Sequence, residues 1–179
     1  MKMQLLALLL VGILLFGCSQ PPKEDGTNTG MPARPFMQVS VNGYSAEVPS
    51  GWSQAKVLSG DISYSNAISK SSIVISSLEM EGSDLLAFAQ GQVGDLDSKY
   101  SIGEYSIKFA RNGALNTFGG REWYVICYTF TNANGKALEQ CSAMTACGAD
   151  AGTVVISSDK GKLQGDLPGF QHALETFSC

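Results

Sequence analysis

The sequence predicts an α+β fold in which helices pack on the faces of a mostly antiparallel sheet. From residue 36 onward apolar residues mostly alternate with polar ones, a period of two that is typical of half-buried strands. Residues 83–100 instead repeat their apolar side chains every three to four positions, as an amphipathic helix does. The strands come in runs separated by turn signals rather than alternating with helices, which favours antiparallel pairing.

The first two strands form a hairpin. Met37, Val39 and Val41 alternate with polar residues, and Asn42-Gly43 then supplies a two-residue type I′ turn. The return strand ends at residues 49–52, where the chain reads PSGW. Two further strands are predicted at residues 61–66 and 72–80.

The main helix is predicted at residues 83–100. Ser83 is the expected N-cap, with Asp84 in the first turn, where negative charge suits the helix dipole. Gly91 and Gly94 lie inside the helix, where each costs up to about 1 kcal/mol relative to Ala, a cost that leaves room for close packing at these positions. The apolar stripe consists of Leu85, Phe88, Ala89, Val93, Leu96 and Tyr100.

The second half of the chain returns to strands. In the segment 123–130 the residues that would face either side of a strand are apolar or aromatic, which indicates a strand covered on both faces. Pro168 then begins a short closing helix marked by Phe170, Leu174 and Phe177. The strands are predicted at residues 104–111, 114–118, 122–131, 137–146 and 152–158.

Four segments together resemble the PsbP/DcrB-like (Mog-type) family. They are VPSGW at 48–52, the helix at 83–100, the Gly119-Gly120 turn before the strand at 123–130, and LETFS at 174–178. The resemblance covers most of residues 36–179 and implies an α/β/α sandwich with an accessory role in an envelope or a protein complex. The fold alone does not identify which role.

The first 17 residues are predicted to be a signal peptide. Lys2 precedes twelve apolar residues, 5–16, which are too few to cross a bilayer. The ending Leu15-Phe16-Gly17-Cys18 resembles the lipobox of bacterial lipoproteins, although Phe16 departs from the small or β-branched residue usual there. This resemblance implies cleavage before Cys18, acyl chains such as palmitate on Cys18, and a membrane anchor. An ordinary secretory signal fits less well, because no small-x-small site follows the apolar run.

The segment after Cys18 is expected to be a flexible tether. Residues 19–35 contain four of the six prolines and almost no large apolar side chains, so they cannot bury enough surface to offset the entropy of ordering. Ser19 occupies the place where lipoproteins retained in the inner membrane usually carry Asp, which favours outer-membrane sorting. The predicted organisation is a signal peptide at 1–17, lipidated Cys18 with its tether at 18–35, and one domain at 36–179.

Charge and histidine content exclude several classes of function. The chain has 12 basic and 16 acidic residues, and losing Lys2 with the signal leaves a net charge of −5. This balance counts against a nucleic-acid partner, which requires a basic surface. The single histidine, His172, would have to serve any Ser/His or Cys/His catalyst, yet no nucleophile elbow is present. His172 is therefore interpreted as a residue of the closing helix.

No cofactor or metal is predicted. His172 and Glu175 are three residues apart and could share a metal, but two ligands are poor support for a site. Trp52, Tyr124 and Tyr128 could stack on a ligand, but their places at a hairpin end and on an interior strand favour the core.

The four cysteines after Cys18 are expected to form two disulfides, with three pairings open in principle. A turn centred on Asn134 puts Cys127 opposite Cys141. The closing helix must run back along the last strand, which returns Cys179 to the strand's start beside Cys147. The predicted disulfides are Cys127–Cys141 and Cys147–Cys179.

The function predicted from these features is that of a non-catalytic, membrane-anchored binding or accessory module with a protein partner in the envelope. The alternative is an immunity or inhibitor lipoprotein that blocks a toxin or hydrolase, since the acidic charge would suit a basic partner. A hydrolytic enzyme is less favoured, because nucleophile–base and carboxylate pairs are missing. If a binding patch exists, the exposed turns at residues 132–136 and 147–151 are its expected bearers.

Overall fold

The structure is a computed structural model that describes residues 35–55, 61–80 and 82–179. The predicted signal peptide, Cys18 and all of the tether except Pro35 lie outside the described residues. The described strands are β1 (Phe36–Val41), β2 (Tyr44–Pro49), β3 (Ser53–Ala55), β4 (Ile62–Ser65), β5 (Ser72–Glu79), β6 (Gly103–Glu104), β7 (Ala114–Phe118), β8 (Arg121–Thr131), β9 (Ala137–Cys147) and β10 (Asp150–Asp159). The described helices are α2 (Leu85–Tyr100), α3 (Leu167–Thr176) and the short 3-10 helix η2 (Leu163–Gly165).

Eight strands form one antiparallel sheet. Their order is β3-β4-β5-β10-β9-β8-β6, and β7 also pairs with β8. The remaining strands, β1 and β2, form a separate hairpin. Asn42 and Gly43 at its turn have φ angles of 49° and 88°, the left-handed values that a type I′ turn needs. The predicted α+β class with a mostly antiparallel sheet is confirmed.

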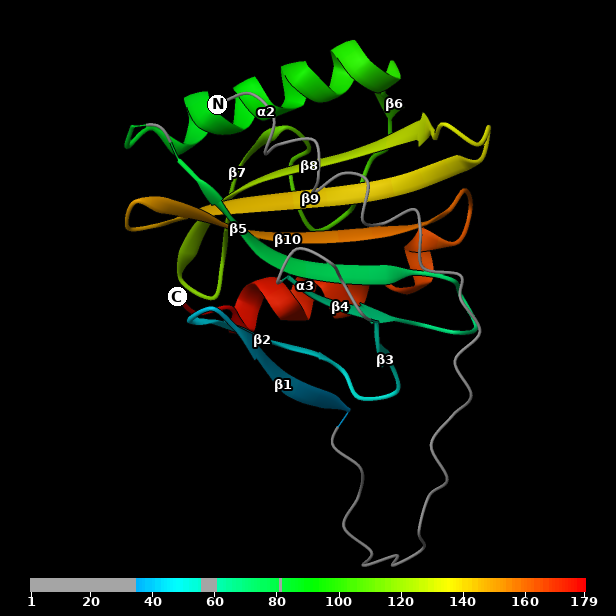
Figure 1. Ribbon diagram of the computed structural model, residues 1–179, viewed down its shortest axis with the longest axis horizontal. Coiled ribbons are helices and arrows are strands. Elements are labelled where there is room, and N and C mark those ends of the chain that lie inside the picture. The colour runs from blue at the N-terminus through cyan, green and yellow to red at the C-terminus, as the bar shows by residue number, and fades with distance from the viewer. Residues whose placement is uncertain (1–34, 56–60, 81) are drawn as a thin grey trace, which may run out of the picture.

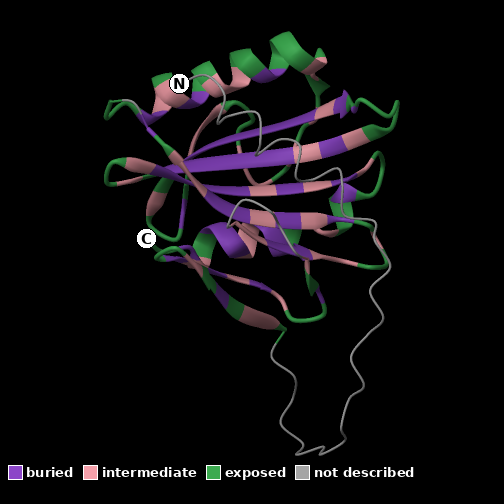
Figure 2. Cartoon of the chain, viewed as in Figure 1, coloured by how far each residue is buried: buried purple, intermediate pink, exposed green. Residues whose placement is uncertain are grey.

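The helices lie on opposite faces of the sheet (Figure 1). Helix α2 lies over β8 and β9, whereas α3 and the β1–β2 hairpin cover the other face. The strand β8 lies between these layers and is buried along most of its length (Figure 2). Trp123 and Val125 face the α3 layer and Tyr124 and Ile126 face α2, as the apolar stretch predicts.

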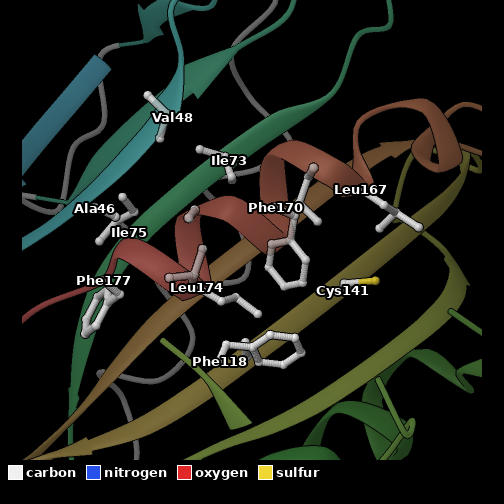
Figure 3. Packing of buried hydrophobic residues seen from close by; sticks show 14 of the residues in the cluster. Ala46, Val48, Ile73, Ile75, Phe118, Cys141, Leu167, Phe170, Leu174 and Phe177 are labelled. Carbon is white, nitrogen blue, oxygen red and sulfur yellow. The ribbon is translucent and has the colours of Figure 1, made fainter. Parts of the chain in front are cut away.

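The larger core lies between the sheet and α3. Phe170 and Leu174 of α3 point toward the sheet and pack with Phe118 of β7 and Cys141 of β9 (Figure 3). Ala46 and Val48 bring the inner side of the hairpin into the same cluster. Trp52 is also part of this cluster, in agreement with its interpretation as a core residue.

The predicted strand at residues 104–111 is wrong for most of its length. Only Gly103 and Glu104 pair with β8, and residues 105–111 leave the sheet and pack Tyr105, Ile107 and Phe109 against the α3-face core. Two tertiary features account for the difference. The side chain of Asn112 bonds to both backbone polar groups of Cys127, filling the gap in β8 pairing, and Phe109 packs between Phe118 and Phe170.

Helix ends differ slightly from prediction. The N-cap of α2 is Asp84 rather than Ser83, because the Ala87 N–H donates to the Asp84 carboxylate at 3.1 Å. Helix α3 begins at Leu167, one residue before Pro168, and ends at Thr176. Beyond it Ser178 exchanges backbone hydrogen bonds with Ser45. The three-residue strand β3 was not predicted.

The two ends of the sheet differ in what they carry. We call one the Cys147 end: it holds the β9–β10 turn, the β7–β8 turn, the start of α2 and Cys179. The opposite Phe36 end holds the start of β1 and the start of α3. Strand β2 spans the two, since the Tyr44 hydroxyl donates to Asp150 at 3.3 Å while Pro49 lies against Gly169 of α3.

Candidate functional site

His172 is part of a contact between α3 and the hairpin. Its Nε2 lies 2.8 Å from Glu47 Oε2, and its ring stacks on Phe36 with centroids 3.7 Å apart. Glu175 instead accepts a hydrogen bond from Gln171 at 2.8 Å. The two residues that could have shared a metal therefore have other partners. No group of three or more His, Cys, Asp or Glu side chains is placed to hold a metal within the described residues.

The structure contains both disulfides at the pairing that the sequence predicts. Cys127 and Cys141 are direct partners of β8 and β9 and are joined with Cα atoms 4.0 Å apart. Cys147 at the end of β9 is joined to Cys179 beyond α3, with Cα atoms 5.9 Å apart. The second bond fixes the chain after α3 to the Cys147 end of the sheet.

Tyr124 and Tyr128 belong to the core beneath α2. Burial raises the pKa of the Tyr128 hydroxyl to about 12, and Gln140 donates a hydrogen bond to it. Burial also raises the pKa of Tyr124. These rings therefore stabilise the fold.

Of the two turns expected to carry a patch, the one at residues 132–136 lies at the Phe36 end. The Asn132 side chain accepts from the backbone N–H groups of Asn134 and Lys136, each at 3.0 Å. Lys136 also forms an ion pair with Asp159. This turn is held by its own contacts. The other turn, 147–151, lies at the Cys147 end.

A groove of about 520 Å³ opens at the Cys147 end beneath the start of α2. Its walls combine Leu85 and Leu86 of α2 with Leu115 of β7, and its polar residues include Asp84, Arg121 and Glu122. Its base includes the end of β9, where the buried Thr145 hydroxyl donates to the Glu122 carbonyl at 2.7 Å. Apolar walls with a charged rim are a common arrangement for a binding surface.

The Cys147 end is predominantly acidic. Asp84 and Glu122 line the groove, and Glu79 and Asp150 lie opposite each other on β5 and β10. Within the described residues, none of these four carboxylates forms an ion pair with Lys, Arg or His. The local cation, Arg121, donates instead to the Ala146 carbonyl at 3.3 Å and to Cys179 Sγ at 3.2 Å.

Sequence reasoning named a turn at this end of the sheet as a bearer of a binding patch, but none of the residues that line the groove. The 147–151 turn was named, but Leu115, Arg121 and Glu122 were not. The Gly119-Gly120 turn could have indicated where Arg121 and Glu122 lie, because a hairpin there places the start of β8 beside the end of β9. The position of α2 over that corner depends on long-range packing, which no local pattern encodes.

The overall fold resembles that of several solved structures. Cyanobacterial PsbP (CyanoP) from Synechocystis matches with a TM-score of 0.57 and 14% identity, over 86% of this chain and 97% of its own. The Ran-binding protein Mog1p of Saccharomyces cerevisiae matches with a TM-score of 0.54 and 14% identity, over 80% and 94%. LpqN, involved in cell envelope biogenesis of Mycobacterium tuberculosis, matches with a TM-score of 0.50 and 14% identity, over 82% and 86%.

These likenesses show a PsbP/Mog1-like α+β fold. A further match, to a crystal structure from Bacteroides thetaiotaomicron with a TM-score of 0.54 and 15% identity, covers 76% of this chain but 45% of that one. No protein-family model matches the sequence, and no curated protein matches it. Among the described residues, neither α2 nor α3 has the length and apolar character needed to cross a membrane.

Proposed function

We propose that this chain is a lipid-anchored lipoprotein of a bacterial envelope that acts as a non-catalytic binding or accessory module. The observation that carries the proposal is the position of the groove, at the end of the sheet opposite Phe36. A tether joined to Phe36 would leave the Cys147 end directed away from the membrane. A partner could then reach that end without displacing the anchor.

Two further observations support this role. LpqN, which is involved in envelope biogenesis, has the same fold. The Leu15-Phe16-Gly17-Cys18 sequence supplies the acylation signal, and several acyl chains give firm attachment at about 0.8 kcal/mol per buried CH₂. Ser19 after the acylated cysteine favours the outer membrane as the destination.

The anchor is tested by Cys18→Ser in the full chain. Labelling with radioactive palmitate should mark the wild type and be lost in the variant, and the variant should keep its signal peptide. A matched pair then tests sorting: Ser19→Asp should move the protein to the inner-membrane fraction, and Ser19→Asn should not. Normal cleavage and release of Cys18→Ser would overturn the lipoprotein proposal.

The alternative of an immunity or inhibitor protein is favoured by one observation, the acidic Cys147 end, which suits a basic toxin or hydrolase. It shares the anchor and binding surface with the first proposal and differs in the partner's activity. A hydrolytic role receives less support, because His172 Nε2 is bonded to Glu47.

A further inference from the structure

We propose that the groove at the Cys147 end binds a basic segment of a partner protein, which inserts an apolar side chain between the start of α2 and β7. This inference rests on the proposed function and names the chemistry of the partner.

The apolar half of the groove is incompletely covered by the chain itself. Leu86 and Leu115 are partly exposed, and Ala146 on the adjoining end of β9 is exposed. Leu85 is buried and closes the inner wall. A volume of about 520 Å³ has room for one large aliphatic or aromatic side chain together with neighbouring backbone. Filling it would remove the exposed leucine surface from water, which favours binding.

The charged half determines which partner fits. Asp84 and Glu122 contribute two carboxylates to the groove, and Glu122 is exposed. Arg121 has its guanidinium committed to the Ala146 carbonyl and Cys179 Sγ, and it lies 5.9 Å from the centre of the Phe177 ring. Lysine or arginine side chains flanking the inserted residue would complement the groove carboxylates.

A second pair of carboxylates lies at the same end, on the sheet face that the β1–β2 hairpin and α3 cover. Glu79 and Asp150 are direct cross-strand partners, a position where like charges destabilise a sheet. The Tyr44 hydroxyl donates to Asp150, but no cation pairs with either residue within the described part of the chain. The pair adds to the negative charge of this end without lining the groove.

The probe for this inference is a fluorescent synthetic peptide in which lysine alternates with leucine. Its binding to the purified full chain in nonionic detergent is followed by anisotropy at low ionic strength, with detergent alone as the blank. Two analogues accompany it, one with glutamate for lysine and one with serine for leucine. The lysine–leucine peptide should bind saturably and at least about tenfold more tightly than either analogue.

Matched variants locate the binding. The first double variant combines Asp84→Asn and Glu122→Gln. It keeps a capping side chain on α2 and removes both carboxylate charges from the groove, so it should weaken peptide binding about tenfold. The control, Asp95→Asn with Glu104→Gln, removes two exposed carboxylates elsewhere and should change affinity less than about twofold. Leu115→Asn should also weaken binding, whereas Leu138→Asn at the Phe36 end should not, with folding of each variant checked by circular dichroism.

Three results would each overturn the groove inference. They are absence of saturable peptide binding, tighter binding of the glutamate analogue, and an equal loss of peptide affinity in the two double variants. The inference would also be overturned if the chain associated with itself in competition with the peptide, because the groove would then bind a second copy of the chain and not a basic partner. Acylation of Cys18 is measured separately. Failure of peptide binding with labelling intact would therefore count against the groove and not against the anchor.

Discussion

Several polar side chains around the sheet are satisfied by specific partners. The Asn112 side chain bonds to both backbone groups of Cys127, in the place that a neighbouring strand would occupy. The buried carboxylate of Glu139 accepts from the Gly161 and Leu163 N–H groups at 2.7 and 3.3 Å. Tyr128, only 1% exposed, accepts from Gln140. Buried polar groups that are bonded in this way specify one arrangement of the loops around the sheet.

Tyr128 should make the protein sensitive to high pH. Its pKa of about 12 lies above the usual 10, so between these values the unfolded chain loses its proton first and stability falls as pH rises. The Tyr128 contribution to this loss is on the order of 2–3 kcal/mol by pH 12. Urea unfolding at a series of pH values measures this loss. Above pH 10 the free energy of unfolding should fall less steeply with pH in Tyr128→Phe than in the wild type. Equal slopes would mean that Tyr128 is not the group responsible.

At the scale of elements, α2 packs on the sheet with one side only. Leu85, Ala89 and Leu96 are its buried residues, and its outer side is exposed along its whole length (Figure 2). No described residue packs closely against Gly91 or Gly94, because a Cβ at either position would meet nothing within 4 Å. Both glycines therefore weaken the helix without a compensating contact among the described residues.

Gly91→Ala and Gly94→Ala should each raise the free energy of unfolding, by up to about 1 kcal/mol. Gly119→Ala is the contrasting control. It should destabilise the fold, because Gly119 has φ +57° and a Cβ there would lie 2.1 Å from the Glu175 carbonyl oxygen. Chemical denaturation of the three variants measures these changes. A loss of stability in Gly91→Ala would show that α2 has a close neighbour at that position.

The elements also show why sequence reasoning succeeded in some places and failed in others. The Asn42-Gly43 turn and the Cys127–Cys141 register follow from spacing along the chain, so local patterns were sufficient. Residues 105–111 have strand-like composition, yet they pack on the α3-face core because Phe109 fits between two distant rings. The groove depends on where α2 crosses the sheet. The helical period placed Leu85 on the apolar stripe, but no local pattern singled out Leu86 or Leu115.

For the whole molecule, the Cys147–Cys179 disulfide joins the sheet to the segment beyond α3. Its sequence separation of 32 gives a chain-entropy stabilisation of about 4 kcal/mol, somewhat more than for the separation of 14 at Cys127–Cys141. Phe177, Leu174 and Phe170 reach the core from the segment that this bond holds. The bond therefore stabilises the complete α3 layer.

Replacing Cys147 and Cys179 together by Ala should lower the free energy of unfolding by about 2–4 kcal/mol. It should also increase hydrogen exchange in α3 more than in β8, because α3 loses its link to the sheet. Urea denaturation and amide exchange measure the two effects. Peptide mapping of the unreduced wild type should recover both pairs, and a peptide joining Cys141 to Cys147 would contradict the pairing.

The burial of the Cys127–Cys141 bond also constrains the order in which the protein can mature. Cys127 is 1% exposed and Cys141 0%, whereas Cys179 is exposed at the surface. An oxidising enzyme must contact a thiol directly to oxidise it. The Cys127–Cys141 bond must therefore form while the β8–β9 hairpin is still open to solvent. The outer bond can close afterwards, on a nearly finished molecule. A newly made chain that packs its core before meeting an oxidant would keep two inaccessible thiols.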